Sequence, residues 1–292
     1  MSDLLSYLEK THDVETAEEA LSRFAREGDR QVPDLASFLR SPAADAVGLG
    51  ARVLAEMGTE AAVAELLKAF SALPEESEVQ REVGDAITTV SNQAAAPFLL
   101  AQLVSRDADD AAVDVIQRAL ANLADPALLA NFAKEYASAS DDAVKERLAD
   151  TVRHVQKPDC VPALAELMQA GKGDCSDPLV AAAADTLGIV GTAEAVNALI
   201  RQLTNAETTD KTGLLAAITR VRNPDALPVL KSAALGTLPD AGRAVRLAAI
   251  VALGILPHNQ SGSVLQGLAI GDPDPEIRHA ALEMLRLRES PH

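Results

Sequence analysis

The sequence contains no tryptophan and few other aromatic residues. Phe, Tyr and Trp together make up 2% of its 292 residues, whereas 48% of the residues are hydrophobic. Ala, Leu and Val therefore carry most of the apolar content. Because Ala and Leu are strong helix formers, while aromatic and β-branched residues favour strands, the composition predicts an all-helical protein.

Positive charge is also scarce. The chain has 26 Lys and Arg residues against 43 Asp and Glu residues, which gives a formal net charge of −17. Such a chain repels phosphate backbones and anionic lipid headgroups. We therefore expect a protein partner, and neither nucleic acid nor a membrane surface.

Long hydrophobic runs and export signals are missing. The longest apolar stretch, residues 247–256, covers about half of the length that a membrane-spanning helix needs. The first 20 residues lack the basic segment and apolar run of a secretory signal. Cys160 and Cys175 belong to no metal-binding or redox motif. The sequence thus predicts a cytoplasmic protein with two reduced thiols.

Catalytic and metal-binding motifs are missing as well. None of the five His residues stands next to Glu, and no P-loop, dinucleotide-binding or nucleophile-elbow pattern occurs. The acidic run at residues 107–110 lacks the spacing and the glycine of an EF-hand calcium loop. We therefore predict no enzymatic activity, and no catalytic, cofactor-binding or metal-binding residues.

What the chain does contain is one segment that recurs along its whole length. Each copy ends a run of apolar residues with a large aliphatic residue, here called the anchor, followed by Gly or a polar turn residue, as in "VLAEMG" (53–58) and "TLGIVG" (186–191). Successive anchors lie 31–35 residues apart, and a weaker copy places Phe24 another 33 residues upstream. The anchors are Met57, Val90, Leu123, Val155, Val190, Val221, Leu256 and Leu287.

Each copy divides into two helices. Apolar residues at helical spacing precede the anchor, as at Val180 and Leu187, and a second stripe follows it at Val196, Leu199 and Leu203. A turn that often contains Pro, Asp or Asn separates the two stripes. Neither helix can bury its stripe alone, so successive copies are expected to stack into a solenoid with a continuous core.

The details of these copies resemble one family of repeats. Apolar-Arg pairs, Val245-Arg246 and Ile277-Arg278, open two of the first helices before a group of alanines. Proline stands early in three second helices, at Pro97, Pro162 and Pro228. The pattern resembles the HEAT repeat in its short bacterial form, as found in phycobilin lyase subunits. The motifs of ankyrin and tetratricopeptide repeats are missing.

The resemblance covers nearly the whole chain and concerns packing residues. It implies an all-α fold, a right-handed α-solenoid of about nine HEAT-like helical hairpins. We expect a single solenoid over residues 1–292, with a capping helix at 1–15 that starts at Ser2, repeats over 16–274 and a half-repeat at 275–292 that closes the array. A HEAT-like deoxyhypusine hydroxylase would show repeated His-Glu pairs that bind iron, and this sequence has none.

Most of the negative charge falls on the turns between copies. Ten-residue windows over eight of these turns carry a net charge of −12, and residues 1–20 carry −5. In a solenoid these turns form one acidic edge, with Glu75, Glu76, Asp109, Asp110 and Asp142 in its densest parts. Two interpretations stay open. The acids either cap the helices that follow, or they bind a basic partner or a divalent cation.

The exposed positions of the second helices carry the prediction of a binding site. The position eleven residues after each anchor lies about 200° around the helix from a buried leucine and should face the concave side. That row is mildly basic, and the row at anchor plus eight, which includes Ala163 and Ala198, is expected beside it. The predicted partner-binding residues are Lys68, Phe98, Asn131, Lys134 and Arg201.

These residues suit an extended acidic segment or an amphipathic helix of a partner protein. The sequence therefore predicts a non-enzymatic scaffold or adaptor that grips a protein along its concave second-helix face. Two alternatives stay open, a chaperone subunit like the phycobilin lyases and a regulatory or assembly subunit of a larger enzyme complex. The remaining aromatic side chains at stripe positions, Phe70, Phe132 and Tyr136, are expected in the core.

Overall fold

The computed structural model describes residues 28–105, 109–205, 211–239 and 242–289. The predicted capping helix at 1–15 with Ser2, the weak copy at Phe24 and the acidic residue Asp107 lie outside the described residues. The described part of the chain consists of α-helices, short 3-10 helices and turns, with no strand. The all-α prediction is confirmed.

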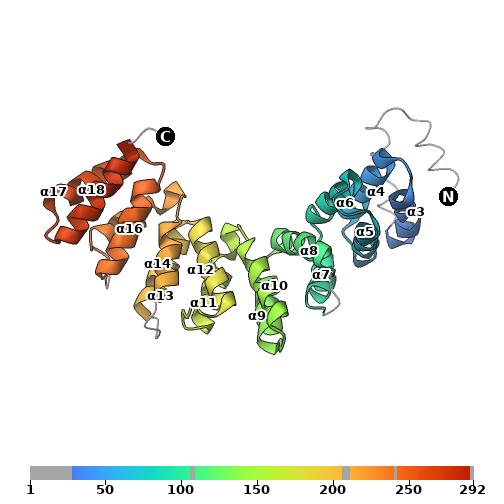
Figure 1. Ribbon diagram of the computed structural model, residues 1–292. Coiled ribbons are helices and arrows are strands. Elements are labelled where there is room, and N and C mark those ends of the chain that lie inside the picture. Colours follow the sequence, from blue (N-terminus) through green and yellow to red (C-terminus); the bar gives the residue numbers. More distant parts are fainter. Residues whose placement is uncertain (1–27, 106–108, 206–210, 240–241, 290–292) are drawn as a thin grey trace. The chain divides into compact units, whose positions relative to one another are not determined.

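The chain divides into two compact units, one ending at Leu123 and the other starting at Ala124. Figure 1 labels most of their helices. The first unit contains α3 (Val32–Ala36), α4 (Ala44–Met57), α5 (Glu60–Ala72), α6 (Glu78–Thr88), α7 (Ala96–Leu103) and α8 (Asp110–Leu123). The second contains α9 (Pro126–Ser138), α10 (Asp142–Arg153), α11 (Val161–Ala170), α12 (Pro178–Val190), α13 (Ala193–Asn205), α14 (Thr212–Thr219), α15 (Leu227–Ala234), α16 (Arg243–Ile255), α17 (Asn259–Gly271) and α18 (Pro275–Glu289).

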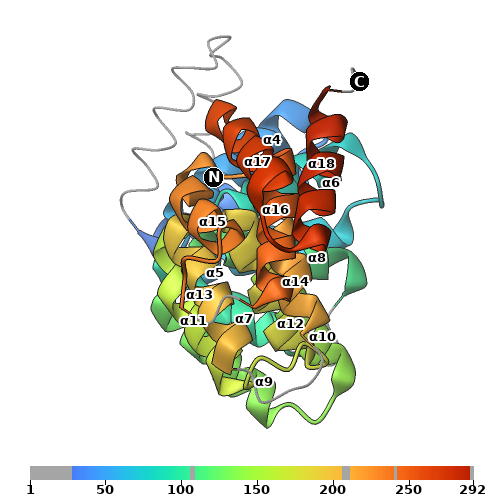
Figure 2. The ribbon, with the colours of Figure 1, turned by 90° about the vertical axis from the view of Figure 1, so that its left-hand side faces the viewer.

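Within each unit the helices follow the predicted hairpin order. The first helices of successive repeats contact one another, α4 to α6 to α8 in the first unit and α10 through α18 in the second. In the second unit the second helices α9, α11, α13, α15 and α17 also contact one another in turn. Figures 1 and 2 show these two sets as separate layers of that unit. Each unit is thus a stack of hairpins of the α-solenoid type, whereas the right-handed superhelix and the single-domain boundaries stay predictions.

The apolar stripes read from the sequence form the core of these stacks. Val180 and Leu187 of α12, and Val196, Leu199 and Leu203 of α13, are at most 3% exposed. Burial of such side chains stabilises a fold by roughly 1.5–3 kcal/mol each. Aliphatic contacts between neighbouring hairpins therefore hold each stack together.

Polar residues two positions after the anchors begin the second helices. Thr59, Asn92, Asp125, Thr192 and Asn223 accept hydrogen bonds from backbone N–H groups of the turn that follows, at 2.7–3.4 Å. These bonds satisfy N–H groups that have no partner within the helix itself. These caps explain why a new helical segment begins within a few residues of each of these anchors.

Some of the same residues also join one repeat to the next. Asn92 Nδ2 donates to the carbonyl oxygen of Met57 at 3.0 Å, and Asn223 Nδ2 donates to that of Val190 at 3.2 Å. At the equivalent position of another repeat, Lys157 Nζ donates to the Ala124 carbonyl at 3.1 Å. Each acceptor lies at or just after the C-terminal end of a first helix, where carbonyl groups lack helical partners.

The Arg residues behind the HEAT resemblance make comparable links in the last repeats. The Arg246 side chain is 16% exposed, pairs with the Asp272 carboxylate and donates through Nε to the Ala234 carbonyl at 3.0 Å. Arg278 Nη1 donates to the Asp272 carbonyl at 2.7 Å. These contacts fix the turn between α17 and α18 against α16, so the apolar-Arg pairs serve packing.

Part of the acidic edge serves as helix caps, which supports one of its two interpretations. Asp109, Asp141 and Asp274 accept backbone N–H groups of Ala111, Ala143 and Glu276, at 3.1, 2.9 and 2.9 Å. Asp110 and Asp142 lie in the first turns of α8 and α10, where a negative charge is favourable. Glu75 and Glu76 are in a different position, in the loop before α6, whose cap is Ser77.

Candidate functional site

The five predicted partner-binding residues lie on second helices and are divided between the two units. Lys68 on α5 is exposed and Phe98 on α7 is half-buried, and both belong to the first unit. Asn131 and Lys134 on α9 and Arg201 on α13 are exposed and belong to the second. Lys68, Lys134 and Arg201 of the anchor-plus-eleven row are thus exposed, whereas their position on a concave side and their role in binding stay predictions.

In the first unit, Lys68 is a surface cation. Its Nζ lies 3.7 Å from Glu65 Oε1, and its side chain is 73% exposed. An exposed pair of this kind contributes at most about 1 kcal/mol to stability. Lys68 therefore remains open to contact a partner.

In the second unit, the row continues over helices that pack on one another. Asn131 and Lys134 are three residues apart and share a face of α9. The row then holds Glu166 on α11 and Arg201 on α13, which are both exposed. The surface alternates in charge, so its basic character is local to Lys134 and Arg201.

The anchor-plus-eight row was expected to be exposed beside the anchor-plus-eleven row, and this expectation is wrong at two positions. Ala163 on α11 is 8% exposed and Ala198 on α13 is 5% exposed. Both side chains are short, and α11 and α13 contact each other as well as their other neighbours, which covers these positions. Asn131, the equivalent residue of α9, is exposed.

Sequence reasoning missed two apolar residues on the same face. Leu235, at the end of α15, is 43% exposed, and Ile270 on α17 is 86% exposed. Both lie fourteen residues after their anchors, Val221 and Leu256, so they hold the same register on helices that contact each other. A comparison of that row across the repeats would have found them, since earlier repeats carry smaller or polar side chains there.

A basic residue accompanies these apolar side chains. Lys231 is exposed on α15, one helical turn before Leu235. Together these residues define what we call the second-helix face of the second unit. Its members are Asn131, Lys134, Glu166, Arg201, Lys231, Leu235 and Ile270.

Tyr136 is more exposed than the core position expected for it. The residue is half-buried on α9, whereas Phe132 is fully buried and Phe70 is 7% exposed. Burial, followed by the charge of Asp177 and a hydrogen bond to its carboxylate, raises the pKa of Tyr136 to about 12. Lys145 Nζ lies 5.8 Å from the ring centroid. Tyr136 thus joins α9 to the start of α12, which Asp177 caps.

Neither Cys160 nor Cys175 forms a disulfide bond. Cys160 is buried, and this burial raises the pKa of its thiol. A protonated, buried thiol is a poor nucleophile. The side chain lies 3.6 Å from the Ala124 carbonyl, which gives it a packing role between repeats.

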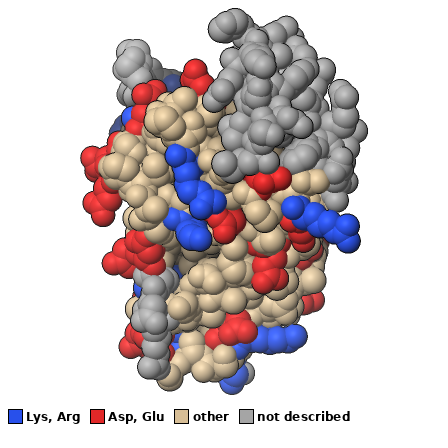
Figure 3. All heavy atoms as spheres, turned by 90° about the vertical axis from the view of Figure 1, so that its right-hand side faces the viewer, with Lys and Arg blue, Asp and Glu red and all other residues tan. Residues whose placement is uncertain are grey.

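Charge is mixed on the surface. On the described part of the face drawn in Figure 3, Asp and Glu side chains are interspersed with Lys and Arg, and neither sign covers it. The described residues contain no group of three or more His, Cys, Asp or Glu side chains that could hold a metal ion. Nor, within that part of the chain, is any helix both long and apolar enough to cross a membrane.

Comparison with known proteins agrees with the repeat architecture. Residues 211–286, which span α14 to α18, match the family model for HEAT repeats. Over this part of the chain the match agrees with the HEAT-like repeats that the sequence predicted. Among solved structures it is similar to human deoxyhypusine hydroxylase in complex with glycerol, with 21% identity, a TM-score of 0.33, and coverage of 89% of this chain and 96% of that chain. No curated protein matches the sequence.

Proposed function

We propose that this helical-repeat scaffold is a non-enzymatic adaptor that binds a partner protein on its second-helix face. The observation that carries the proposal is the register of the exposed side chains in the second unit. Leu235 and Ile270 repeat on adjacent helices, and Lys134, Arg201 and Lys231 lie on the same layer. Contiguous exposed apolar patches with polar residues around them are typical of interaction surfaces, and Leu235 and Ile270 would form such a patch together.

The chemistry of this face suits an acidic amphipathic helix or an extended acidic segment. Neighbouring helices pack about 8–10 Å apart, so Leu235 and Ile270 present two apolar contacts at a spacing that one partner segment spans. Lys231, one helical turn before Leu235, and Arg201, on the neighbouring helix α13, would meet acidic residues of the partner. In the first unit, Lys68 and Phe98 offer a cation and an aromatic side chain from equivalent helices. We place the protein in the cytoplasm, where Cys160 and Cys175 would stay reduced.

Charge reversal at Lys134 and Arg201 of this face, together with Lys68 on a second helix of the first unit, tests the proposal. We expect the triple variant Lys68→Glu, Lys134→Glu and Arg201→Glu to lose the native partner in copurification from the host, because its charges would repel an acidic segment. Circular dichroism should show an unchanged helical signal.

The matched control reverses charge on the acidic edge. The variant Asp107→Lys, Asp109→Lys and Asp110→Lys should keep the partner. If the acidic-edge variant loses the partner and the second-helix variant retains it, the binding surface is the opposite edge and the proposal is wrong.

A further inference from the structure

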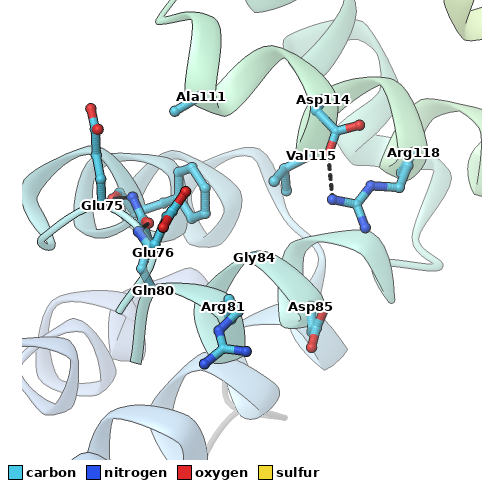
Figure 4. A pocket seen from close by; sticks show the side chains of 11 residues that line it. Glu75, Glu76, Gln80, Arg81, Gly84, Asp85, Ala111, Asp114, Val115 and Arg118 are labelled. Carbon is cyan, nitrogen blue, oxygen red and sulfur yellow. Dashed lines mark hydrogen bonds and ion pairs between the residues drawn. The ribbon is translucent and has the colours of Figure 1, made fainter. Parts of the chain in front are cut away.

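The first unit contains a groove that lies apart from the residues of the second-helix face. It runs between α6, α8 and the loop that joins α5 to α6, and its volume is about 670 Å³. Figure 4 shows the side chains that line it, with Glu75 and Glu76 on the loop and Asp114 and Arg118 on α8. All of its lining residues belong to the first unit.

The floor of the groove is apolar. Phe70 is 7% exposed and Val115 is 4% exposed, so both are fixed by the core beneath them. Gly84 of α6 lies against them, because a Cβ atom at this position would stand 3.0 Å from Phe70 Cε2 and 3.5 Å from Val115 Cγ2. The floor therefore consists of an aromatic edge, a branched aliphatic side chain and bare helix backbone.

The loop wall is held in place by a buried side chain. Gln80 is 7% exposed, and its Nε2 donates to the Phe70 carbonyl at 3.3 Å. Its Oε1 accepts the backbone N–H of Glu76 at 2.8 Å. Glu76 itself has a φ of 58°, in the left-handed region. A wall that is already ordered reduces the entropy lost when a ligand binds.

The rim of the groove is acidic on balance. Its carboxylates are Glu75, Glu76, Asp85 and Asp114, and its cations are Arg81 and Arg118. Arg118 pairs with Asp114 on the same helix, which leaves the loop carboxylates and Asp85 opposite the single cation of Arg81. Asp109 and Asp141 cap helices, whereas the cap of α6 is Ser77 and not Glu75 or Glu76.

We propose that this groove docks a basic segment of a partner protein. A Lys or Arg of that segment lays its aliphatic stem on Phe70 and Val115, and its cation meets the carboxylates of Glu75, Glu76 and Asp85. The edge of the Phe70 ring closes one side of the apolar contact. This site has the opposite charge preference to the second-helix face and does not depend on the function proposed for that face.

A labelled peptide of about twelve residues that alternates Leu with Arg and Lys is the probe, measured with the full chain by fluorescence anisotropy. We expect binding that weakens as salt increases. The variant Glu75→Gln, Glu76→Gln and Asp85→Asn should bind at least about tenfold more weakly, because the electrostatic partner of the cation is removed.

The control variant makes the same change in net charge elsewhere. Asp159→Asn, Glu146→Gln and Glu194→Gln alter exposed residues of the second unit that belong neither to the groove nor to the second-helix face, and should leave peptide affinity within about twofold of the wild type. Equal losses in the two triple variants would mean that the peptide senses only net charge, and would overturn the proposal.

A second groove variant tests shape rather than charge. Ala111 is exposed at the start of α8 and lines the groove, so Ala111→Trp should occlude it without disturbing the core. We expect the same loss of at least about tenfold, with an unchanged thermal transition. Unchanged peptide affinity in this variant would contradict docking in the groove.

The last arm distinguishes a protein segment from a small polyamine. Spermidine should displace the peptide only at concentrations far above the peptide's own dissociation constant, because one spermidine molecule presents fewer cations and less apolar surface to the groove than the peptide does. If spermidine competes as well as the peptide does, the groove is a small-amine site and the proposal is wrong. The variant at Lys68, Lys134 and Arg201 tests the second-helix face and not the groove, because none of these residues lines the groove. Its outcome therefore does not decide whether a basic segment docks in the groove.

Discussion

At the scale of single residues, helix phase decides the effect of a substitution. Leu199 is fully buried on α13, and Lys68 has a side chain that is 73% exposed on α5. Leu199→Ala removes a packed side chain and leaves a cavity, so we expect a loss of about 2–5 kcal/mol in the free energy of unfolding. Lys68→Ala should change it by less than about 0.5 kcal/mol. Urea denaturation measures both, and equal effects would mean that the helix phase is wrong.

Asp274 provides a residue-scale prediction about acid. The backbone N–H of Glu276 is the main cause that lowers the pKa of Asp274 from its usual 3.8, with Arg243 adding to the effect. Because the pKa of Asp274 is lower in the folded protein than in the unfolded protein, its charge stabilises the fold at any pH above the unfolded pKa. This stabilisation is lost as the pH falls through the folded pKa.

The variant Asp274→Asn keeps a side-chain oxygen for the cap and removes the charge. Its free energy of unfolding should lie below that of the wild type at neutral pH, and the difference should shrink as the pH falls below 3.8. Urea denaturation at several pH values measures this. A difference that is constant over the whole range would contradict the assigned role of the charge.

At the scale of helices and turns, the residue two positions after the anchor has two tasks. Asn223 caps the turn before α15 through Oδ1 and joins it to the preceding repeat through Nδ2. Asn223→Ala removes both contacts, and we expect a loss of about 1–2 kcal/mol in the free energy of unfolding.

The variant Asn223→Asp separates these two tasks. A carboxylate keeps the cap but places negative charge against the Val190 carbonyl, so it should remain clearly less stable than the wild type. Chemical denaturation of the three proteins gives the comparison. If Asn223→Asp matched the wild type, the contact to the preceding repeat would contribute nothing.

The sequence predicts the helical hairpins well because their signal is periodic. The anchors Met57, Leu123 and Val190 end α4, α8 and α12, as their spacing indicates. Prolines at 97, 162 and 228 stand in the first turn of their helices, as expected from the missing N–H. These features depend on residues within one repeat, so a single chain segment is enough to show them.

The parts that the sequence did not predict arise between elements. Ala163 and Ala198 are buried because a neighbouring helix covers them, which no helical phase reveals. The groove beside Gly84 depends on how α6, α8 and a loop meet. Leu235 and Ile270 had a signal in the repeat register, but only the structure shows that both are exposed and that α15 and α17 contact each other.

At the scale of the whole molecule, the repeats produce surfaces of different chemistry from one kind of hairpin. The second-helix face of the second unit presents Leu235, Ile270 and three cations, while the groove of the first unit presents carboxylates over an apolar floor. The core positions are mainly aliphatic in both units, with Phe70 and Phe132 among the exceptions. Because stacking depends on the core and not on the exposed positions, a solenoid can vary its surface from repeat to repeat without changing its fold.

The central claim is that a partner protein binds on the second-helix face, and amine-reactive cross-linking of the native complex tests it most directly. Lys134 on α9 and Lys231 on α15 are exposed on that face, whereas Lys145 on α10 and Lys172 after α11 lie off it. We expect mass spectrometry to find cross-links from the partner to Lys134 and Lys231. Cross-links confined to Lys145 and Lys172 would place the partner elsewhere and contradict the claim.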